Sequence, residues 1–377
     1  MATANETIFD LTLRHEVAVR RFTRGEVRRV LELATRTDNE IAAKLLRELP
    51  DSFAATRLRE LLADCRRLRR VLTNMLGESF NETLIQVAEG EQDAAAKNLR
   101  DSLPIEISMA TVSAEALRVA ALTTRIHDKF LKEWWDKVAD REQRRILDAL
   151  RLGYAQGESI PEMVRRIRGT RAAGYADGII AGTRRDIEAV VRTGINDVSN
   201  KVREQFFEAN ADIIACLRWT STLDGRTTPI CRARDGQMAP VAGKPLPANA
   251  VALDPPEARP PAHVGCRSVM TPIIDGVGVV GERPFVRGRR SIGKLRFPTP
   301  EAKREWIEKN VGRVPAETTY EEWIRKQPAE FQDDVLGPRR GELFREDGLT
   351  LDQFVDHSGK EYTLKQLRGM YPSAFVE

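Results

Sequence analysis

Three sulfur and nitrogen ligands could meet near the middle of this 377-residue chain. Cys231 follows a turn-forming Asp-Gly-Arg-Thr sequence, and His263 and Cys266 stand three positions apart further along. That spacing allows both side chains to point at one centre. Because thiolate sulfur and imidazole nitrogen are ligands that zinc prefers, we predict that Cys231, His263 and Cys266 form one cluster.

Three interpretations of this cluster stay open. The first is a structural metal knuckle, which would stabilise loops poor in apolar residues and needs a fourth ligand from Cys216, Asp224, Asp235 or outside the region. The second is a metal-free polar network that would serve the same end less strongly. Its members would be Asp224, Arg226, His263 and Arg267. The third is a Cys-His nucleophile.

Motifs of the common enzyme classes are absent from the sequence. It contains no GxxxxGK[ST], GxSxG or HExxH pattern, and His15, His127 and His357 stand alone without ligand spacing. We therefore expect a protein that is not an enzyme. The alternative is a latent nuclease or toxin-like enzyme in the C-terminal half, for which His263, Arg267 and His357 are the candidate groups.

Strands are expected to position the cluster. Residues 212–222 alternate between two sets of side chains, the pattern of a half-buried strand. Asp224 follows that strand, and Gly225 permits the positive φ of a tight turn. Residues 271–281 are short, β-branched and glycine-bounded, which predicts a strand that pairs with residues 212–222.

Helices are expected before the strands. Apolar residues recur at three- and four-residue steps from about residue 15 to 210. The predicted helices cover residues 51–76, 80–100, 112–138, 141–153 and 183–209. Asp51-Ser52 is a good N-cap for the first, and Thr183-x-x-Asp186 resembles a capping box for the last.

The C-terminal part combines a basic segment with short helices. Residues 282–297 hold six basic side chains that are candidates for contact with DNA or an acidic partner: Arg283, Arg287, Arg289, Arg290, Lys294 and Arg296. Helices are predicted over residues 300–310, 318–326 and 328–336, and Thr319-x-x-Glu322 offers a helix start.

Together these patterns predict an α+β fold that is predominantly α. We expect an elongated helical domain over residues 1–210, a small strand-containing domain with the Cys/His cluster over 211–282, and a basic linker with a small helical module over 283–377. Net charge is only +4, from 60 basic and 56 acidic side chains, so bulk charge does not indicate a dedicated nucleic-acid binder. Four cysteines and the lack of a long apolar run favour a protein without disulfides that is made in a cytoplasm.

The order of the unusual residues resembles that of one family. The chain reads W-T-S-x-L-D-x-R-T, then C, then D-G, and closes with P-x-H-x-x-C-R-S. This order is similar to the phage Mu F-like minor head proteins, the SPP1-type head morphogenesis proteins. The residues that carry the resemblance are Trp219, Asp224, Arg226, Thr227, Cys231, His263, Cys266 and Arg267. Many relatives resemble R-T-C-x-x-C at the turn, but this chain has Thr228 in place of the first cysteine.

The resemblance implies a virion protein, a minor capsid component in phage head morphogenesis that is made in the bacterial host cytoplasm. Its implied partners are the portal and the procapsid, with double-stranded DNA as a further candidate and no membrane. It implies a location in the phage head, at the portal vertex. Zinc is the candidate cofactor, and the threonine at position 228 leaves its fourth ligand unknown.

Overall fold

The computed structural model describes residues 4–103, 108–123, 125–126, 129–274, 281–288 and 295–375. It is 62% helical, with 12 helices and small sheets of up to three strands among these residues, which confirms a predominantly α member of the α+β class. The chain divides into two compact units. One unit comprises Val17–Glu91 and Ser113–Lys201, and the other comprises Met1–Glu16, Gln92–Val112 and Val202–Glu377. The domain bounds at residues 210 and 282 stay a prediction.

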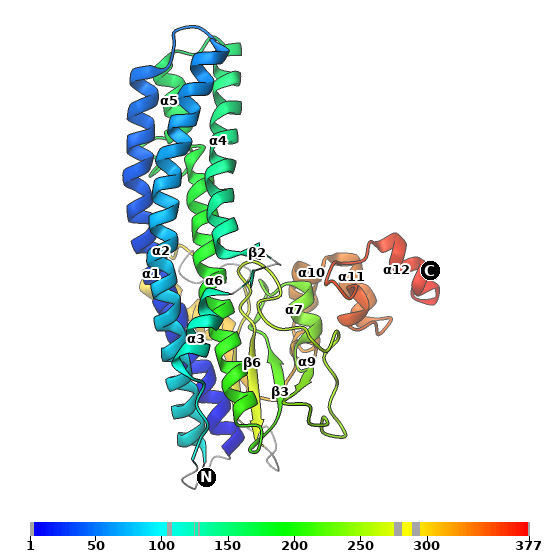
Figure 1. Ribbon diagram of the computed structural model, residues 1–377. Coiled ribbons are helices and arrows are strands. Elements are labelled where there is room, and N and C mark those ends of the chain that lie inside the picture. Colours follow the sequence, from blue (N-terminus) through cyan, green and yellow to red (C-terminus); the bar gives the residue numbers. More distant parts are fainter. Residues whose placement is uncertain are drawn as a thin grey trace. The chain divides into compact units, whose positions relative to one another are not determined.

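The first unit is a bundle of helices that run side by side (Figure 1). It is built from all or part of α1 (Ala4–Glu48), α2 (Ala55–Ser102), α3 (Ala114–Leu122), α4 (Leu131–Ala155), α5 (Ile160–Arg168) and α6 (Ile180–Ala209). Its apolar core includes Ile41, Leu62, Ile146 and Ile167. Arg69 is fully buried in this unit and is paired with Asp38 and Glu142.

Helix α2 corrects the prediction of two separate helices over residues 51–76 and 80–100. The helix runs without interruption from Ala55 to Ser102. A Cβ added at Gly77 would lie 3.3 Å from the Trp135 ring, so the small residue here lets another helix approach closely. Trp135 is buried, whereas its neighbour Trp134 is partly exposed.

Three other predicted helix bounds are wrong. The helix predicted over residues 112–138 is two helices, α3 and α4, and α4 continues to Ala155 through the break predicted before residue 141. A short ladder of β1 (Arg125–Ile126) and β2 (Lys129–Phe130) lies between them. His127 lies outside the described residues. Thr183 is not a helix cap, because α6 begins at Ile180, and Asp186 pairs instead with Arg145 at 2.9 Å.

The second unit contains two three-stranded sheets. The first has the order β5 (Met238–Pro240), β3 (Ile214–Thr220), β6 (Val269–Ile274), with both pairings antiparallel. This confirms the predicted pairing of the two strands that flank the cluster. The second has the order β4 (Leu223–Asp224), β7 (Glu282–Val286), β8 (Val311–Pro315). Strands β7 and β8 extend beyond the predicted strand region, and β7 occupies the start of the predicted basic linker.

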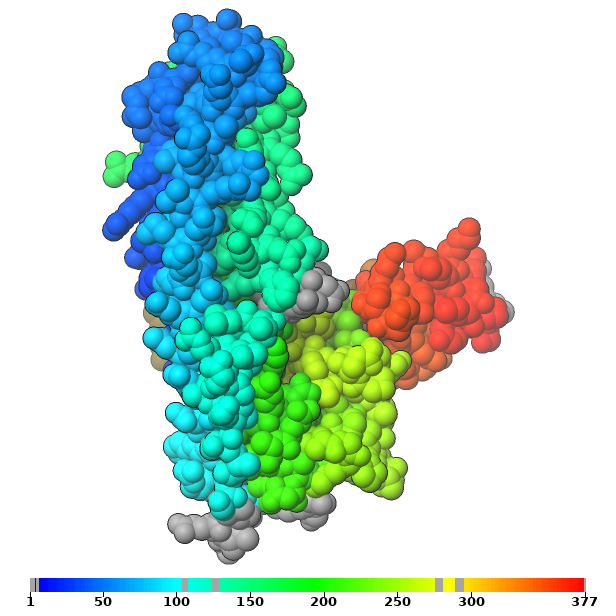
Figure 2. Space-filling view, in the orientation of Figure 1, coloured from blue at the N-terminus to red at the C-terminus, as the bar shows by residue number. Residues whose placement is uncertain are grey.

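Short helices complete this unit. They are α7 (Pro229–Arg234), α8 (Pro300–Asn310), α9 (Tyr320–Arg325), α10 (Ala329–Leu336), α11 (Pro338–Arg345) and α12 (Leu364–Met370), with 3₁₀ turns at Asp352–Phe354 and Pro372–Phe375. Thr319 caps α9 in a capping box with Glu322, as predicted. Tyr320, Trp323 and Phe344 belong to one buried core, and the orange and red C-terminal residues form a continuous group in Figure 2. None of the helices in the described ranges has both the length and the apolar character needed to span a membrane.

Candidate functional site

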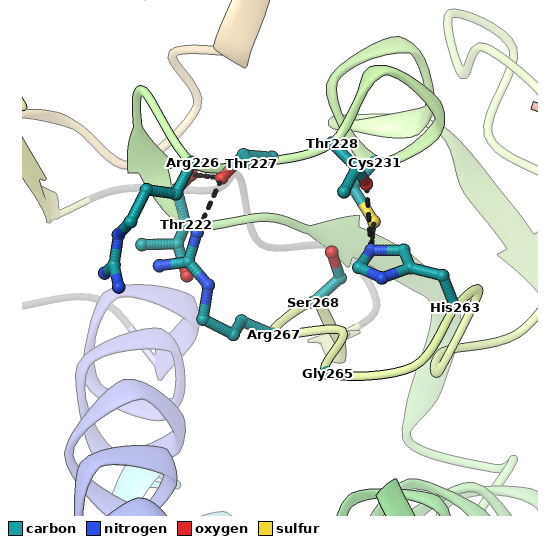
Figure 3. A pocket seen from close by; sticks show the side chains of 9 residues that line it. All are labelled: Thr222, Arg226, Thr227, Thr228, Cys231, His263, Gly265, Arg267 and Ser268. Atoms are coloured by element: carbon teal, nitrogen blue, oxygen red, sulfur yellow. Dashed lines mark hydrogen bonds between the residues drawn. The ribbon is translucent and has the colours of Figure 1, made fainter. Parts of the chain in front are cut away.

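The cluster is positioned by three neighbouring backbone features. β3 and β4 lead into a turn at residues 225–228, and Thr228 is the N-cap of α7, so Cys231 lies in the first turn of that helix. His263 and Cys266 lie on the loop that leads into β6. The pairing of β6 with β3 brings that loop back to the turn (Figure 3).

The structure brings the three predicted ligands together. Cys231 Sγ lies 3.4 Å from His263 Nε2 and 3.7 Å from Cys266 Sγ. The three ligand atoms lie within 4.8 Å of one another, and in the described part of the chain they form the one His, Cys and carboxylate group of this kind. The fourth ligands considered from sequence, Cys216, Asp224 and Asp235, are not members of this group.

The ring of His263 is oriented by a backbone oxygen. Its Nδ1 lies 3.0 Å from the carbonyl oxygen of Val264. Because a carbonyl only accepts hydrogen bonds, Nδ1 carries a proton and donates it. In the neutral ring, Nε2 then presents its lone pair to the hydroxyl of Thr228 at 2.8 Å and to the sulfur of Cys231. A backbone carbonyl that fixes the tautomer in this way is common behind metal-binding histidines.

The two cysteines of the cluster have pKa values that are shifted in opposite directions. A hydrogen bond from Cys231 lowers the pKa of Cys266 well below its usual range, against the effect of burial and with help from His263. The same bond, together with burial, raises the pKa of Cys231. Burial lowers the pKa of His263, but its interactions with Cys266 outweigh burial and raise it. The hydrogen bond between the two sulfurs therefore shifts their pKa values in opposite directions.

Asp224 forms a second group beside the sulfurs. Arg267 donates from Nη1 and Nη2 to the two carboxylate oxygens at 2.6 and 2.7 Å, and the backbone N–H of Arg226 donates to Oδ1 at 3.0 Å. Burial raises the pKa of Asp224, but the hydrogen bonds and charge of Arg267, together with the charge of Arg226, outweigh burial and lower it. Thr227 donates its hydroxyl to the carbonyl of Thr222, which closes the turn.

A small hollow joins the two groups. It measures about 30 Å³ and is lined by nine residues, among them Arg226, His263 and Arg267 (Figure 3). The predicted set of Asp224, Arg226, Cys231, His263, Cys266 and Arg267 therefore lies around one place. Trp219 stands apart from the hollow: it is fully buried, and its Nε1 donates to Ser221 Oγ at 3.0 Å.

Asp235 was considered from sequence only as a fourth metal ligand, and Tyr320 was not identified at all. Asp235 accepts hydrogen bonds from the backbone N–H groups of Ser221 and Tyr320, each at 2.6 Å. The hydroxyl of Tyr320 donates to the backbone carbonyl of Asp224 at 2.8 Å. The Asp-Gly pair in the motif order was the available signal for Asp235, whereas Tyr320 carries no such local signal.

The basic segment needs a correction at Arg283. This side chain is buried and pairs with Asp235 at 2.9 Å, so it is not available to DNA or a partner. Arg287 donates to Gln327 at 2.6 Å, and Arg296 is exposed. The other three candidates, Arg289, Arg290 and Lys294, lie outside the described residues.

Comparison with known proteins identifies one family. Residues 144–271 match the family described as phage Mu protein F like protein. The match begins within α4 and ends in β6, so it includes α7 and all three cluster residues. Neither the search of curated proteins nor the search of solved structures finds a match. Residues 144–271, which contain Asp224, Arg267 and all three cluster residues, are thus similar to the phage Mu F-like family.

Proposed function

We propose that this protein is a minor head protein that acts in phage head morphogenesis and associates with the portal and the procapsid. The observation that carries the proposal is the family match over residues 144–271, because the Mu F-like family is a family of structural head proteins. The similarity to this family supports a phage head protein. Binding to the portal and a place at the portal vertex are the more specific parts of this proposal.

We propose further that the site is structural and not catalytic. Asp224 and Arg267 satisfy each other through two short hydrogen bonds, and the sulfurs of Cys231 and Cys266 belong to buried residues. The hollow beside them, about 30 Å³, has room for water but not for a nucleotide or a peptide side chain. These features support a centre that holds loops in place.

The alternative, a latent nuclease or toxin-like enzyme, receives no specific support. It would use His263, Arg267 and His357. The guanidinium of Arg267 is bound to Asp224 on two sides, which leaves it poorly placed to bind a phosphate. His357 offers its backbone carbonyl to Arg234 at 3.4 Å, and nothing in the described contacts brings its ring to His263.

The donor set fits zinc. In a tetrahedral site with zinc–sulfur bonds of about 2.3 Å and a zinc–nitrogen bond of about 2.0 Å, neighbouring ligand atoms stand about 3.5–3.8 Å apart. Two of the three observed separations lie close to these values, 3.7 Å between the sulfurs and 3.4 Å between Cys231 Sγ and His263 Nε2, and all three ligand atoms lie within 4.8 Å of one another. We propose that Cys231, His263 and Cys266 hold a structural zinc ion, which would tie α7 to the loop before β6.

Contact with packaged DNA is a further proposal. Fewer basic side chains are available for it than the sequence suggested, because Arg283 is buried. Of the described basic candidates, Arg296 is exposed and Arg287 is partly buried against Gln327. Exposed arginines of this kind bind phosphate through charge, so any such contact should weaken as salt rises.

Assembly in vitro tests the head-protein proposal. Purified chain is mixed with portal rings and procapsids of its own phage, and incorporation is measured after sedimentation. The expected result is incorporation of the wild-type chain, with the protein located at the portal vertex by electron microscopy. Failure to bind either particle, together with nucleic-acid turnover that His263→Ala abolishes, would replace the proposal with the enzyme.

Metal analysis tests the zinc proposal separately. The expected content is about one zinc ion per chain. Cys266→Ser should remove the ion, and Cys216→Ser is the matched control, because Cys216 is also buried but its sulfur faces Met238 Sδ at 3.6 Å. Purified protein without zinc, even after refolding in its presence, would contradict the proposal.

A further inference from the structure

Two cysteines of the site have sulfur atoms in contact. Cys231 Sγ lies 3.7 Å from Cys266 Sγ, and all four cysteines of the chain are in the reduced form. A disulfide bond joins its sulfurs at about 2.05 Å, so this pair needs to approach by less than about 2 Å to become linked. The other two cysteines lie elsewhere: Cys65 belongs to the core of the helical bundle, and Cys216 faces Met238 Sδ at 3.6 Å.

Cys266 lies next to a surface loop that leaves room for this approach. Val264 and Gly265, the two residues before it, are exposed. Gly265 has φ of +74°, and nothing lies within 4 Å of a Cβ added there, so no neighbouring atoms hold the loop in place at this residue. Cys231 is fixed more firmly, because it lies within helix α7. A shift of the loop can therefore bring the sulfurs together while α7 keeps its place.

The surroundings of the two sulfurs suit a disulfide. Both cysteines are buried, and a disulfide is uncharged, so it avoids the desolvation penalty that a buried thiolate carries. His263 does not depend on the sulfurs for its hydrogen bonds. Its Nδ1 lies 3.0 Å from the carbonyl oxygen of Val264, and its Nε2 lies 2.8 Å from the hydroxyl of Thr228. Oxidation of the sulfurs therefore leaves both ring nitrogens with partners.

The hollow gives a small oxidant access to one of the two cysteines. It measures about 30 Å³, and Cys231 is among the residues that line it (Figure 3). A water molecule needs about 10–15 Å³ of such space, so hydrogen peroxide, which has two oxygen atoms instead of one, also fits. Cys266 is not among the lining residues. Cys231 is therefore the cysteine that meets such an oxidant first.

We propose that Cys231 and Cys266 form a site of reversible oxidation, at which hydrogen peroxide converts the two thiols into a disulfide. The sulfur of Cys231 attacks one peroxide oxygen, the oxygen–oxygen bond breaks, and a sulfenic acid and a water form. The sulfur of Cys266 then attacks the sulfur of Cys231, the sulfur–oxygen bond breaks, and a second water leaves. Two thiols and one peroxide thus give one disulfide and two waters, and two electrons pass from the sulfurs to the peroxide.

Oxidation and zinc binding exclude each other at this site. Zinc is bound by thiolates, and neither sulfur of a disulfide is a thiolate, so oxidation releases an ion held by Cys231, His263 and Cys266. A reducing cytoplasm keeps the pair reduced, whereas an oxidising environment favours the disulfide. The disulfide then replaces zinc as the link between α7 and the loop before β6. Zinc release rests on the proposed zinc site, but disulfide formation does not.

Mass spectrometry of the full chain tests the proposal. Reduced, chelator-treated protein is exposed to hydrogen peroxide, the remaining thiols are blocked with iodoacetamide, and the protein is digested with trypsin. Arg232 and Arg234 lie between the two cysteines, so Cys231 and Cys266 fall on different peptides. The expected product is a pair of peptides joined through Cys231 and Cys266, with a loss of two of the four thiols that dithiothreitol reverses.

Two variants serve as matched controls. Cys216→Ser removes a buried cysteine outside the pair and should form the same disulfide. Cys266→Ser removes the partner of Cys231, so this variant should form no intramolecular disulfide, and its Cys231 should stop at the sulfenic acid, which dimedone traps. Circular dichroism establishes that each variant is folded. The result for the wild type decides the proposal even if Cys266→Ser does not fold.

The outcomes separate the disulfide from the zinc site. Peroxide that oxidises Cys231 without linking it to Cys266, or that joins Cys65 and Cys216 into disulfides equally often, would overturn the proposal. In a zinc-loaded chain, a chromophoric chelator should detect about one ion released for each disulfide formed. A disulfide that forms while zinc is retained would support the oxidation site and place the metal elsewhere. Bound zinc in a chain that never forms the disulfide would overturn the oxidation site alone.

Discussion

Two buried ion pairs in the same unit differ in how completely they are closed. In the pair of Asp235 and Arg283, the side chains are 0% and 2% exposed. In the pair of Asp224 and Arg267, the aspartate is 4% exposed but the arginine is 23% exposed and faces the hollow. Both aspartates follow β3 in the sequence. The pair of Asp235 and Arg283 is closed to solvent, whereas the pair of Asp224 and Arg267 borders a hollow that is large enough for water.

This difference in exposure indicates that the closed pair, Asp235 and Arg283, stabilises the fold, whereas the open pair, Asp224 and Arg267, borders the candidate site. Arg283 on β7 reaches Asp235 at the end of α7 and also donates to the carbonyl of Thr318 at 2.7 Å. Asp235 in turn accepts from the N–H groups of Ser221 and Tyr320. The closed pair therefore joins β7 to the end of α7 and the start of α9, whereas the open pair joins the turn after β4 to the loop before β6.

The largest expected effect comes from breaking the closed pair. Asp235→Ala leaves the guanidinium of Arg283 buried without a counter-charge, which typically costs about 3–5 kcal/mol. We expect a loss of that size in the free energy of unfolding, measured by urea denaturation. Asp212→Ala, at an exposed position just before β3, is the control and should change stability by less than about 0.5 kcal/mol. Equal effects of the two changes would show that the pair does not carry the fold.

Zinc binding should stabilise the folded chain by slightly less than the loss expected for Asp235→Ala. A ligand that binds the folded chain at one hundred times its dissociation constant adds about 2.7 kcal/mol to the free energy of unfolding. We expect this gain on adding zinc to the chelator-treated wild type and expect none in Cys266→Ser. The gain should persist in Asp235→Ala if that variant folds, because Asp235 is not a member of the ligand group. Stabilisation of Cys266→Ser by zinc would place the metal elsewhere.

The sequence allowed part of this arrangement to be predicted. The pairing of the strands that flank the cluster and the start of α9 at Thr319 follow from local alternation and capping patterns, which depend on neighbours in the chain. The convergence of Cys231 with His263 and Cys266 was predictable because cysteine and histidine are rare in this chain and because His263 and Cys266 stand three positions apart.

The closed pair was not predictable in the same way. Arg283 stands in a basic segment and was assigned to an exposed contact, because its partner Asp235 lies 48 positions earlier and no local pattern reports burial of a charge. The predicted break between two helices near Gly77 was wrong for a related reason. Gly77 leaves room for Trp135 of another helix, whereas in the sequence alone a glycine indicates a helix break. Long-range contacts decided both positions.

The contribution of the open pair to the free energy of unfolding should depend on pH, because it requires the charged carboxylate of Asp224. Asp224→Asn keeps the shape but removes the charge that Arg267 and Arg226 face, and we expect a loss of about 2 kcal/mol at pH 6, the scale of hydrogen bonds to charged groups. Because the folded pKa of Asp224 is lowered, its contribution is present above the unfolded value of about 3.9 and is lost as pH falls through the folded pKa. Tyr320, whose hydroxyl faces the backbone of Asp224, stays neutral over this range.

Urea denaturation of both proteins from pH 6 to pH 3 measures this effect. The difference in unfolding free energy between wild type and Asp224→Asn should narrow below about pH 4. Other groups titrate equally in both proteins and cancel in the difference. A gap that stays constant down to pH 3 would mean that the carboxylate charge does not stabilise the turn.

The smallest expected effect concerns the glycine that follows the closed pair. Gly236 has φ of +90°, and a Cβ there would lie 2.7 Å from Cγ2 of Thr319, the N-cap of α9. Gly236→Ala should therefore lower the unfolding free energy by about 1–2 kcal/mol, the usual cost of an L-residue with left-handed backbone. Gly25→Ala is the opposite case: it lies inside α1 with nothing within 4 Å of an added Cβ, so it should raise stability by about 1 kcal/mol. If thermal and urea unfolding gave both alanines the same sign, the segment after Asp235 would not be held as tightly as its hydrogen bonds indicate, and the contrast between the closed and the open pair would rest on Asp235 and Arg283 alone.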